Sequence, residues 1–308
     1  FSYFLHEALQ VPVAVIVTSW GSSSIEGWMP LDMTEQLPHF KAMMEQLLTL
    51  PSVSRVNHAI TMGVRPGFVW LRKRPNLLYN AMLHPIIPYA CRGMVWYQGE
   101  ANANKPDAYG RSLPLWTRRL RQAWGRDDFH LLAVMLPGFG QDDGRPDGKS
   151  WAWFREAQMK VLALPHASVA NTIDLGDANN IHPTDKAPIC ERLALLARSD
   201  VHGEAIIGRG PAYRGSTVHG QRMTIEFAHA DGLSTSDGKA PTGFWLADAQ
   251  HSWHPATATI DGDKIVLQAD NVATPAACRY AWSGKPEVNL VNKVGLPAYP
   301  FRTDDWPR

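Results

Sequence analysis

The spacing of apolar residues predicts alternating helices and strands over the first two thirds of the chain. Phe1, Phe4, Leu5 and Leu9 recur at helical spacing, so the sequence begins within an amphipathic helix. The continuous apolar run VPVAVIV at 11–17 predicts a strand buried on both faces of a parallel sheet. Further helices are expected at 31–48, 111–125, 150–164 and 187–201, and further buried strands at 91–99, 130–140 and 167–176.

This alternation predicts an α/β fold with a parallel sheet. Residues 50–75, rich in Pro, Arg and Val, show no clear periodicity. After residue 203, short alternating stretches separated by Gly, Asp and Pro predict a smaller antiparallel β-sandwich, with a hairpin at 260–267. We therefore expect a first domain over residues 1–202 and an accessory domain over 203–308.

Composition excludes several classes of partner and cofactor. Thirty basic residues nearly balance twenty-nine acidic ones, so the net charge of +1 gives no reason to expect nucleic acid or an anionic membrane as partner. No apolar run approaches the ~20 residues of a membrane span. Three cysteines are too few for a disulfide framework or a zinc site, and neither a zinc-binding His motif nor a glycine-rich nucleotide motif is present. We expect no metal and no cofactor.

Polar residues follow three of the predicted strands directly, where ligands bind in open parallel sheets. Gly21 leaves its backbone N–H free to approach a substrate, since no side chain obstructs it. The Gln98 amide can donate to a developing oxyanion, and His182 can serve as a general base near neutral pH. Each residue taken alone also fits a turn, a polar loop or a structural histidine.

Other residues near these strand ends are weaker candidates. Ser22–Ser24 offer hydroxyl groups, but no G-x-S-x-G pattern surrounds them. Aromatic rings stack on sugar faces, although packing in the core explains such residues equally well. The candidates for a sugar platform are Trp20, Trp28 and Tyr97, and those for holding the loops in place are Asn80 and Glu100.

Several blocks of the sequence resemble, in order, blocks of the sialate O-acetylesterase family, a branch of the SGNH (GDSL-like) hydrolases. They are TSWGSSSIEGWMP, LLYNAMLHPIIPYACRGMVWYQGEANA, WFREAQ, IHPTDKAPICERLALLA and GLPAYPFRTDDW. The resemblance implies a three-layer α/β/α sandwich with accessory β-domains. It also implies a serine esterase that removes acetyl groups from sugars, with His182 as base and with Gln98 and Gly21 as oxyanion donors.

The chain departs from the family pattern at the nucleophile. The family's serine lies in a GQSN block upstream of the first block quoted above, and these 308 residues contain no GQSN. We therefore expect an N-terminal segment of the same polypeptide to supply the serine and the first strand of the sheet. Without that strand, an edge of the parallel sheet and apolar surface would be exposed.

Two further departures concern the base and the acyl pocket. Asn179 and Asn180 precede His182 where the family and other SGNH enzymes place acidic residues, so Asp177 is a weak candidate for a third catalytic member, and a Ser–His dyad is the alternative. Ser22 stands where the family has a second glycine, and its side chain is expected to narrow the acyl pocket toward acetyl.

Two alternatives to a sialate O-acetylesterase remain open. One is an esterase of acetylated xylan or another plant glycan, because the sequence does not determine the sugar. The other is a carbohydrate-binding protein with an inactive site, which the absent serine favours and the retained YQGE and IHP blocks disfavour. A periplasmic or secreted location is expected, because family members that act on glycans are often exported.

Overall fold

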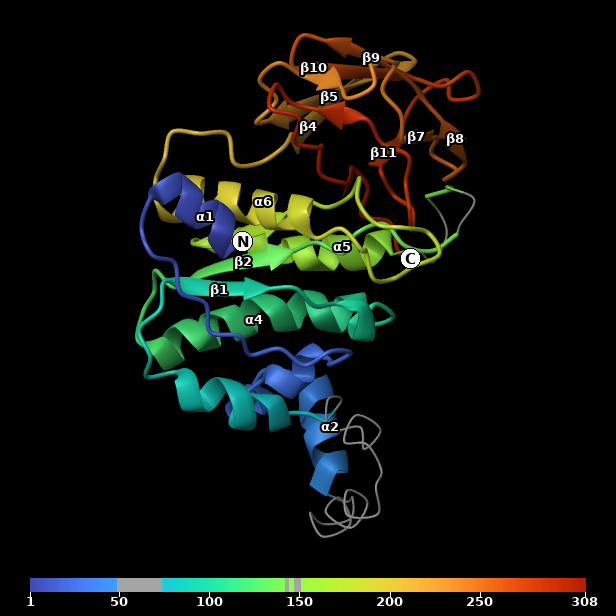
Figure 1. Ribbon diagram of the computed structural model, residues 1–308. Helices are drawn as coiled ribbons and strands as arrows, with labels where there is room; N and C mark the ends of the chain where they lie inside the picture. The colour runs from blue at the N-terminus through green and yellow to red at the C-terminus, as the bar shows by residue number, and fades with distance from the viewer. Residues whose placement is uncertain (49–73, 142–143, 147–150) are drawn as a thin grey trace.

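The computed structural model describes residues 1–48, 74–141, 144–146 and 151–308. Most of the irregular stretch expected at 50–75 lies outside the described residues. Figure 1 shows helices packed around a small parallel sheet, with a β-rich part, drawn in orange and red, beside them. Among the described residues, no helix is both long and apolar enough to cross a membrane.

The parallel sheet has three strands in the order β1 (Gly93–Trp96), β2 (His130–Val134) and β3 (Ala167–Ala170). Each strand lies within a run of apolar residues predicted to be a strand, so these three predictions are confirmed. The central strand β2 is buried along its whole length, as expected for a strand covered on both faces. Among the described residues β1 pairs with β2 alone and so forms an edge.

Helices cover both faces of this sheet and make three layers (Figure 1). Side chains of β2 alternate between two hydrophobic clusters. Leu131 and Ala133 join the cluster of α4 (Pro106–Trp124) and α5 (Ala152–Met159), whereas Leu132 and Val134 join that of α1 (Ser2–Leu9) and α6 (Ala187–Leu196). The predicted amphipathic helix at the start of the chain is confirmed as α1.

Further helical elements surround these layers. They are η1 (Ile25–Trp28), η2 (Leu31–Glu35), α2 (Pro38–Leu48), η5 (Tyr79–Leu83), η6 (His84–Ile86), η7 (Glu100–Asn102), η8 (Lys160–Ala163) and η9 (Ala197–Val201).

The prediction of a buried strand at 11–17 is wrong. The segment forms no strand, and the exposed fractions of Val15, Ile16 and Val17 are 57%, 47% and 76%. It passes beside α1 and β1 (blue in Figure 1) without pairing with the described sheet. Apolar β-branched residues favour a strand, but a strand also needs a neighbour that satisfies its backbone, and these residues have none in the described part of the chain.

The last third of the chain is antiparallel β, as predicted after residue 203. One sheet has the order β4 (Ala212–His219), β5 (Arg222–Ala228), β10 (Lys264–Gln268), β9 (Thr257–Asp261). A second has the order β13 (Phe301–Arg302), β11 (Ala277–Tyr280), β7 (Phe244–Ala247), β8 (Trp253–Pro255), and β12 (Leu290–Val291) pairs with β6 (Ser234–Thr235). The hairpin predicted at 260–267 is confirmed by the β9–β10 pairing.

Candidate active site

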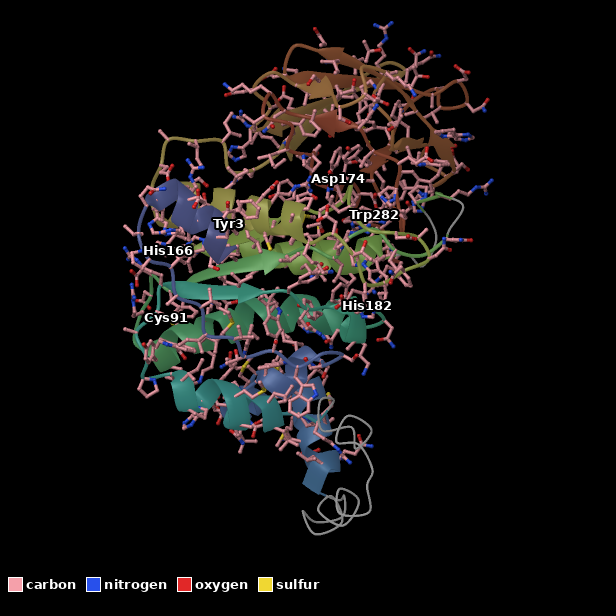
Figure 2. The ribbon with its side chains drawn as sticks, viewed as in Figure 1. Tyr3, Cys91, His166, Asp174, His182 and Trp282 are labelled. Atoms are coloured by element: carbon pink, nitrogen blue, oxygen red, sulfur yellow. The ribbon has the colours of Figure 1, made fainter. Side chains whose placement is uncertain are left out.

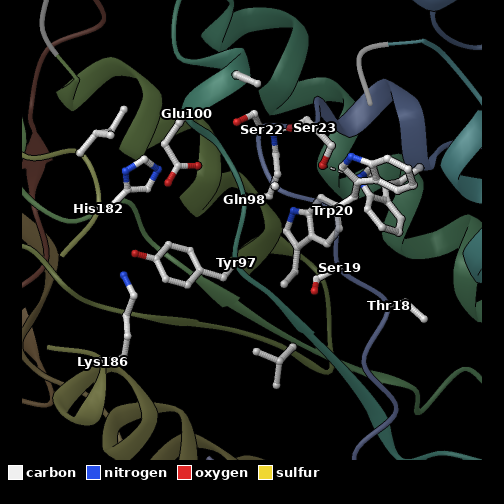
Figure 3. A pocket seen from close by; sticks show the side chains of 16 residues that line it. Thr18, Ser19, Trp20, Ser22, Ser23, Tyr97, Gln98, Glu100, His182 and Lys186 are labelled. Atoms are coloured by element: carbon white, nitrogen blue, oxygen red, sulfur yellow. Dashed lines mark hydrogen bonds between the residues drawn. The ribbon is translucent and has the colours of Figure 1, made fainter. Parts of the chain in front are cut away.

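A cavity of about 650 Å³ lies where β1 ends, and three separate segments line it (Figure 3). They are residues 18–23 with 28, residues 95–98 with 100 and 101, and residues 181, 182 and 186. Gly21, Gln98 and His182, which are far apart in the sequence, all line this one cavity. A primary amide, an imidazole and an unobstructed backbone segment therefore face a common space.

The predicted sugar-platform residues also line the cavity but differ in exposure. The exposed fraction is 37% for Trp20 but only 2% for Trp28, and Tyr97 is half-buried. The Trp28 indole N–H donates to Ser23 Oγ at 2.9 Å and its ring packs edge-on against Trp96. Trp28 is thus a core residue at the back of the cavity, and Trp20 and Tyr97 are the rings that a ligand can reach.

Asp177 and Asn80 do not line the cavity. The Asn80 amide donates to Asn76 Oδ1 at 2.7 Å, and Asn76 donates in turn to the backbone oxygens of Met29 and Glu26 at 2.9 Å. The Asn80 side chain is exposed. Through the Asn76 amide it is connected to the segment behind the cavity.

The turn that carries His182 is closed by side-chain bonds to the backbone. Asp177 Oδ1 accepts the Asn179 N–H at 2.7 Å, and Asn180 Oδ1 accepts the His182 N–H at 3.0 Å. These short-range bonds are typical of Asn and Asp in turns. His182 itself is exposed at the cavity, and its ring forms no ion pair with a carboxylate of the described residues.

Buried polar groups hold the Gln98 amide. Gln98 Nε2 donates to the Ser23 carbonyl and to Asn102 Oδ1, both at 2.9 Å, while Gln98 Oε1 is buried without a partner among the described residues. Asn102 Nδ2 donates to the two carboxylate oxygens of Glu26 at 3.2 and 3.0 Å. The chain Glu26–Asn102–Gln98 runs from the core to the cavity wall.

The Glu26 carboxylate is ionised although it is only 2% exposed. Burial opposes ionisation, but the His39 ring, with Nε2 3.7 Å from Oε1, and the Asn102 amide outweigh it, so the pKa of Glu26 falls from 4.5 to about 2. Sequence reasoning did not assign a role to Glu26 or Asn102. Glu26 lies in the block TSWGSSSIEGWMP and Asn102 in the stretch YQGEANA, so their place in the family-like blocks was the only sequence feature that pointed to them.

The two glycines of the candidate site differ in what requires them. A Cβ on Gly99 would lie 2.5 Å from Phe154 Cε1 and 3.0 Å from Leu136 Cγ, so packing behind the cavity excludes a side chain there. A Cβ on Gly21 would meet nothing within 4 Å. Next to Gly21, Ser22 has a left-handed backbone, at φ 58°. The space beside Gly21 is thus open to a ligand.

The ionisable carboxylate, imidazole and amine side chains among the described lining residues are those of Glu100, His182 and Lys186. Lys186 Nζ lies 5.3 Å from the centroid of the Tyr97 ring. Burial, with a smaller contribution from Glu100, raises the pKa of Tyr97 to about 12, so its hydroxyl stays protonated. Figure 3 shows the Glu100 carboxylate on the same side of the cavity as the His182 ring.

A group of Ser, His and Asp side chains also lies away from the cavity, and its role is structural. His130 Nε2 lies 3.0 Å from Ser168 Oγ, and that hydroxyl donates to Asp200. Both His130 and Ser168 are at least 96% buried at the amino ends of their strands. In Figure 2, Cys91 and His166 mark that end of the sheet and His182 lies at the other. Burial lowers the pKa of His130 to about 4, so this imidazole is neutral.

Among the described residues, no three His, Cys, Asp or Glu side chains form a group that could hold a metal ion. The described cysteines Cys91, Cys190 and Cys278 are free thiols.

Known proteins resemble this chain in sequence and in fold. The profile of the family "Carbohydrate esterase, sialic acid-specific acetylesterase" matches residues 66–195. The sialate O-acetylesterases of Pongo abelii and Homo sapiens are each 26% identical over 98% of this chain and 59% of their own length. The crystal structure of a carbohydrate acetylesterase from Xanthomonas citri superposes with a TM-score of 0.81 at 34% identity, covering 99% of this chain and 65% of that one.

The family profile matches within the α/β part, whereas the two curated relatives and the solved structure match the α/β part and the β-rich part together. Together they support placing the chain in the sialate O-acetylesterase family of carbohydrate esterases. It spans 59% of the length of the curated relatives named above.

Proposed function

We propose that this chain forms the base-and-oxyanion half of a carbohydrate O-acetylesterase, with His182 as general base. The observation that carries the proposal is the shared cavity of His182, Gln98 and Gly21 at the end of β1. Trp20 and Tyr97 at the cavity mouth suit the face of a sugar ring. An exported location, periplasmic or secreted, is part of the same proposal.

In the proposed reaction a serine Oγ attacks the acetyl carbonyl carbon while His182 accepts the hydroxyl proton. The carbonyl oxygen becomes an oxyanion, which N–H donors near Gly21 and Gln98 stabilise. The bond to the sugar oxygen then breaks, and His182 returns the proton to that oxygen. Water, deprotonated by His182, attacks the acetyl-serine, and acetate leaves as the serine hydroxyl is restored.

The oxyanion must compete for the Gln98 amide, because both Nε2 hydrogens already have acceptors. A charged oxygen is a stronger acceptor than a neutral carbonyl. We propose that the bond from Nε2 to the Ser23 carbonyl is the one exchanged, while the bond to Asn102 remains.

The nucleophile is proposed to come from a segment of the polypeptide outside these 308 residues. Support comes from the apolar surface beside β1: Val95 on that edge strand is 39% exposed and lines the cavity, and Val15–Val17, directly before the cavity-lining residues 18–23, are exposed. Within the cavity, Ser23 Oγ already accepts from the Trp28 indole. An added strand at this edge would cover apolar surface and satisfy backbone groups of β1.

The sugar is proposed to be O-acetylated sialic acid, with acetylated xylan or another plant glycan as the alternative. Lys186 favours the first, because its ammonium group lies at the cavity mouth and sialic acid carries a carboxylate. Acetate release from O-acetylated sialic acid compared with acetylated xylan, each at equal ester concentration, distinguishes the two.

Hydrolysis of p-nitrophenyl acetate by the intact gene product, with and without a serine-directed inhibitor, tests the proposed chemistry. We expect turnover that the inhibitor abolishes, with the label on a serine outside residues 1–308. A label on one of Ser22–Ser24 would contradict the external nucleophile. A protein that binds sugars but shows no inhibitor-sensitive turnover would be the inactive carbohydrate-binding protein instead.

A further inference from the structure

The buried Glu26 carboxylate is linked to the candidate site through the side-chain amides of Asn102 and Gln98, and it has no part in the proposed reaction steps. Glu26 and Asn102 are each 2% exposed, and Gln98 is 8% exposed. Glu26 lies in η1, Asn102 ends η7, and the hydrogen bonds between them join segments 76 residues apart. A desolvated carboxylate is costly unless its hydrogen bonds compensate, so its position calls for an explanation.

The surroundings of Asn102 allow one orientation of its amide. An ionised carboxylate only accepts hydrogen bonds, so the Asn102 edge that faces Glu26 must be the NH₂ group. The opposite edge faces the backbone N–H of Ile25, a donor, at 3.0 Å and must therefore be the oxygen. If the amide rotated by 180°, oxygen would face carboxylate and NH₂ would face N–H.

The orientation of Asn102 determines that of Gln98. Its Oδ1 atom and the Ser23 carbonyl are both acceptors, and both lie 2.9 Å from Gln98 Nε2. Gln98 Oε1 contacts no donor among the described residues, so nothing on that side fixes the amide. The two acceptors of Nε2 alone set which end of the amide points toward Ser23 and Asn102.

We propose that Glu26 is a positioning residue for the reaction: through Asn102, its carboxylate holds the Gln98 amide with Nε2 at the oxyanion position. The inference rests on the proposed function, since it gives Gln98 its role as donor. An oxyanion donor accelerates a reaction because it is oriented before charge develops, and an amide free to rotate would lose that advantage. Asn102 keeps one Nε2 hydrogen while the other turns to the oxyanion.

A double-mutant cycle in the intact gene product tests the proposal. Glu26→Gln keeps the size of the side chain but can donate as well as accept, so Asn102 and then Gln98 can rotate. We expect kcat for acetyl-ester hydrolysis to fall by about 10-fold or more with KM changed by less than about 2-fold. In the Gln98→Ala background the same substitution should change kcat by less than about 2-fold, because the group through which it acts is gone. Independent, multiplicative losses would overturn the proposal.

Glu156→Gln is the matched control, because Glu156 is a carboxylate paired with Arg302, whose Nε donates at 2.7 Å, and does not line the cavity. It should leave kcat unchanged even if it lowers the melting temperature. If Glu26→Gln does not fold, Asn102→Ala replaces it in the double-mutant cycle with Gln98→Ala.

A second readout is independent of activity. The Gln98 side-chain NH₂ resonances, assigned by their loss in Gln98→Ala, should be dispersed and slow to exchange in the unmodified protein and should lose that protection in Glu26→Gln. Unchanged protection would overturn the inference even in an active enzyme. If no variant and not even the unmodified protein hydrolyses acetyl esters, the proposed function fails, and the exchange measurement alone decides whether Glu26 orients Gln98.

Discussion

Single residues at the cavity show both what the sequence determines and what it leaves open. Gln98 and His182 were identifiable because each comes after a strand at the end where ligands bind, whereas the strand predicted before Gly21 does not form. Their shared cavity is as expected. The Glu26–Asn102 support was not identifiable, since it depends on the contact of segments 76 residues apart. Likewise, Asp177 was chosen by its spacing from His182, yet its carboxylate bonds to the Asn179 backbone and lies outside the cavity lining.

Glu100 is the carboxylate that we expect to stabilise the His182 imidazolium, because among the described lining residues it is the acidic one. Glu100→Gln should lower kcat by about 10-fold or more, whereas Asp177→Asn should change it by less than about 2-fold. Steady-state kinetics on acetyl esters compare the two variants. The reverse order of effects would assign the third catalytic position to Asp177, and no effect of either would indicate a Ser–His dyad.

Ser22 combines a left-handed backbone with a side chain in the cavity lining. Ser22→Gly removes the side chain and suits φ 58°, so we expect the ratio of kcat/KM for butyryl over acetyl esters to rise by about 10-fold without loss of stability. Ser22→Ala, which keeps a Cβ, should give a smaller rise. An unchanged ratio in Ser22→Gly would show that Ser22 does not limit the size of the acyl group.

At the scale of elements, runs of mostly apolar residues located the strands β1, β2 and β3, of which only β2 is buried along its whole length. The same reasoning failed for residues 11–17, because apolar composition reports a tendency to be buried but does not supply a pairing partner. A glycine follows Gln98 in the turn after β1 because Phe154 and Leu136 occupy the space that a side chain at Gly99 would need.

Gly99→Ala should lower the free energy of unfolding by about 1–3 kcal/mol, because the new methyl group overlaps a buried ring. Urea denaturation measures the difference. Gly215→Ala is the control, since a Cβ there would meet nothing within 4 Å. Equal stability of the two variants would mean that the packing behind Gln98 is looser than the distances indicate.

Acid should destabilise the fold in two steps. The pKa of His130 is about 4 in the folded state and about 6.5 in the unfolded state, so stability is full above pH 6.5 and falls as the pH drops from 6.5 to 4. The pKa of Glu26 is about 2 when folded and 4.5 when unfolded, so its contribution is lost between pH 4.5 and 2.

Melting temperatures recorded across pH 2–8 check this order. His130→Asn should flatten the decline between pH 6.5 and 4, where His229, whose pKa burial also lowers, still contributes. Glu26→Gln should flatten the decline between pH 4.5 and 2. A His130→Asn profile parallel to that of the unmodified protein would contradict the assignment of the first step.

At the scale of the whole molecule, the α/β and β-rich parts are joined by buried hydrogen bonds. Arg155 of α5 is fully buried and donates to the carbonyls of Leu136 and Pro137 after β2 and to those of Ser283 and Gly284 beyond β11. The Tyr299 hydroxyl donates to the Val169 carbonyl in β3 at 2.6 Å. We propose the division at residues 202 and 203 as a boundary between two domains that stabilise each other. The boundary stays a prediction from the change in sequence pattern after residue 203, and the bonds across it depend on the folded arrangement.

The most direct test of the central claim is acetate release from an O-acetylated sugar by the intact gene product, compared with its His182→Ala variant at matched folded concentration. The account predicts that the variant retains the melting temperature of the unmodified protein to within a few degrees and loses nearly all turnover. Undiminished acetate release by the folded variant would contradict the assignment of His182 as the base, and with it the cavity at the end of β1 as the active site.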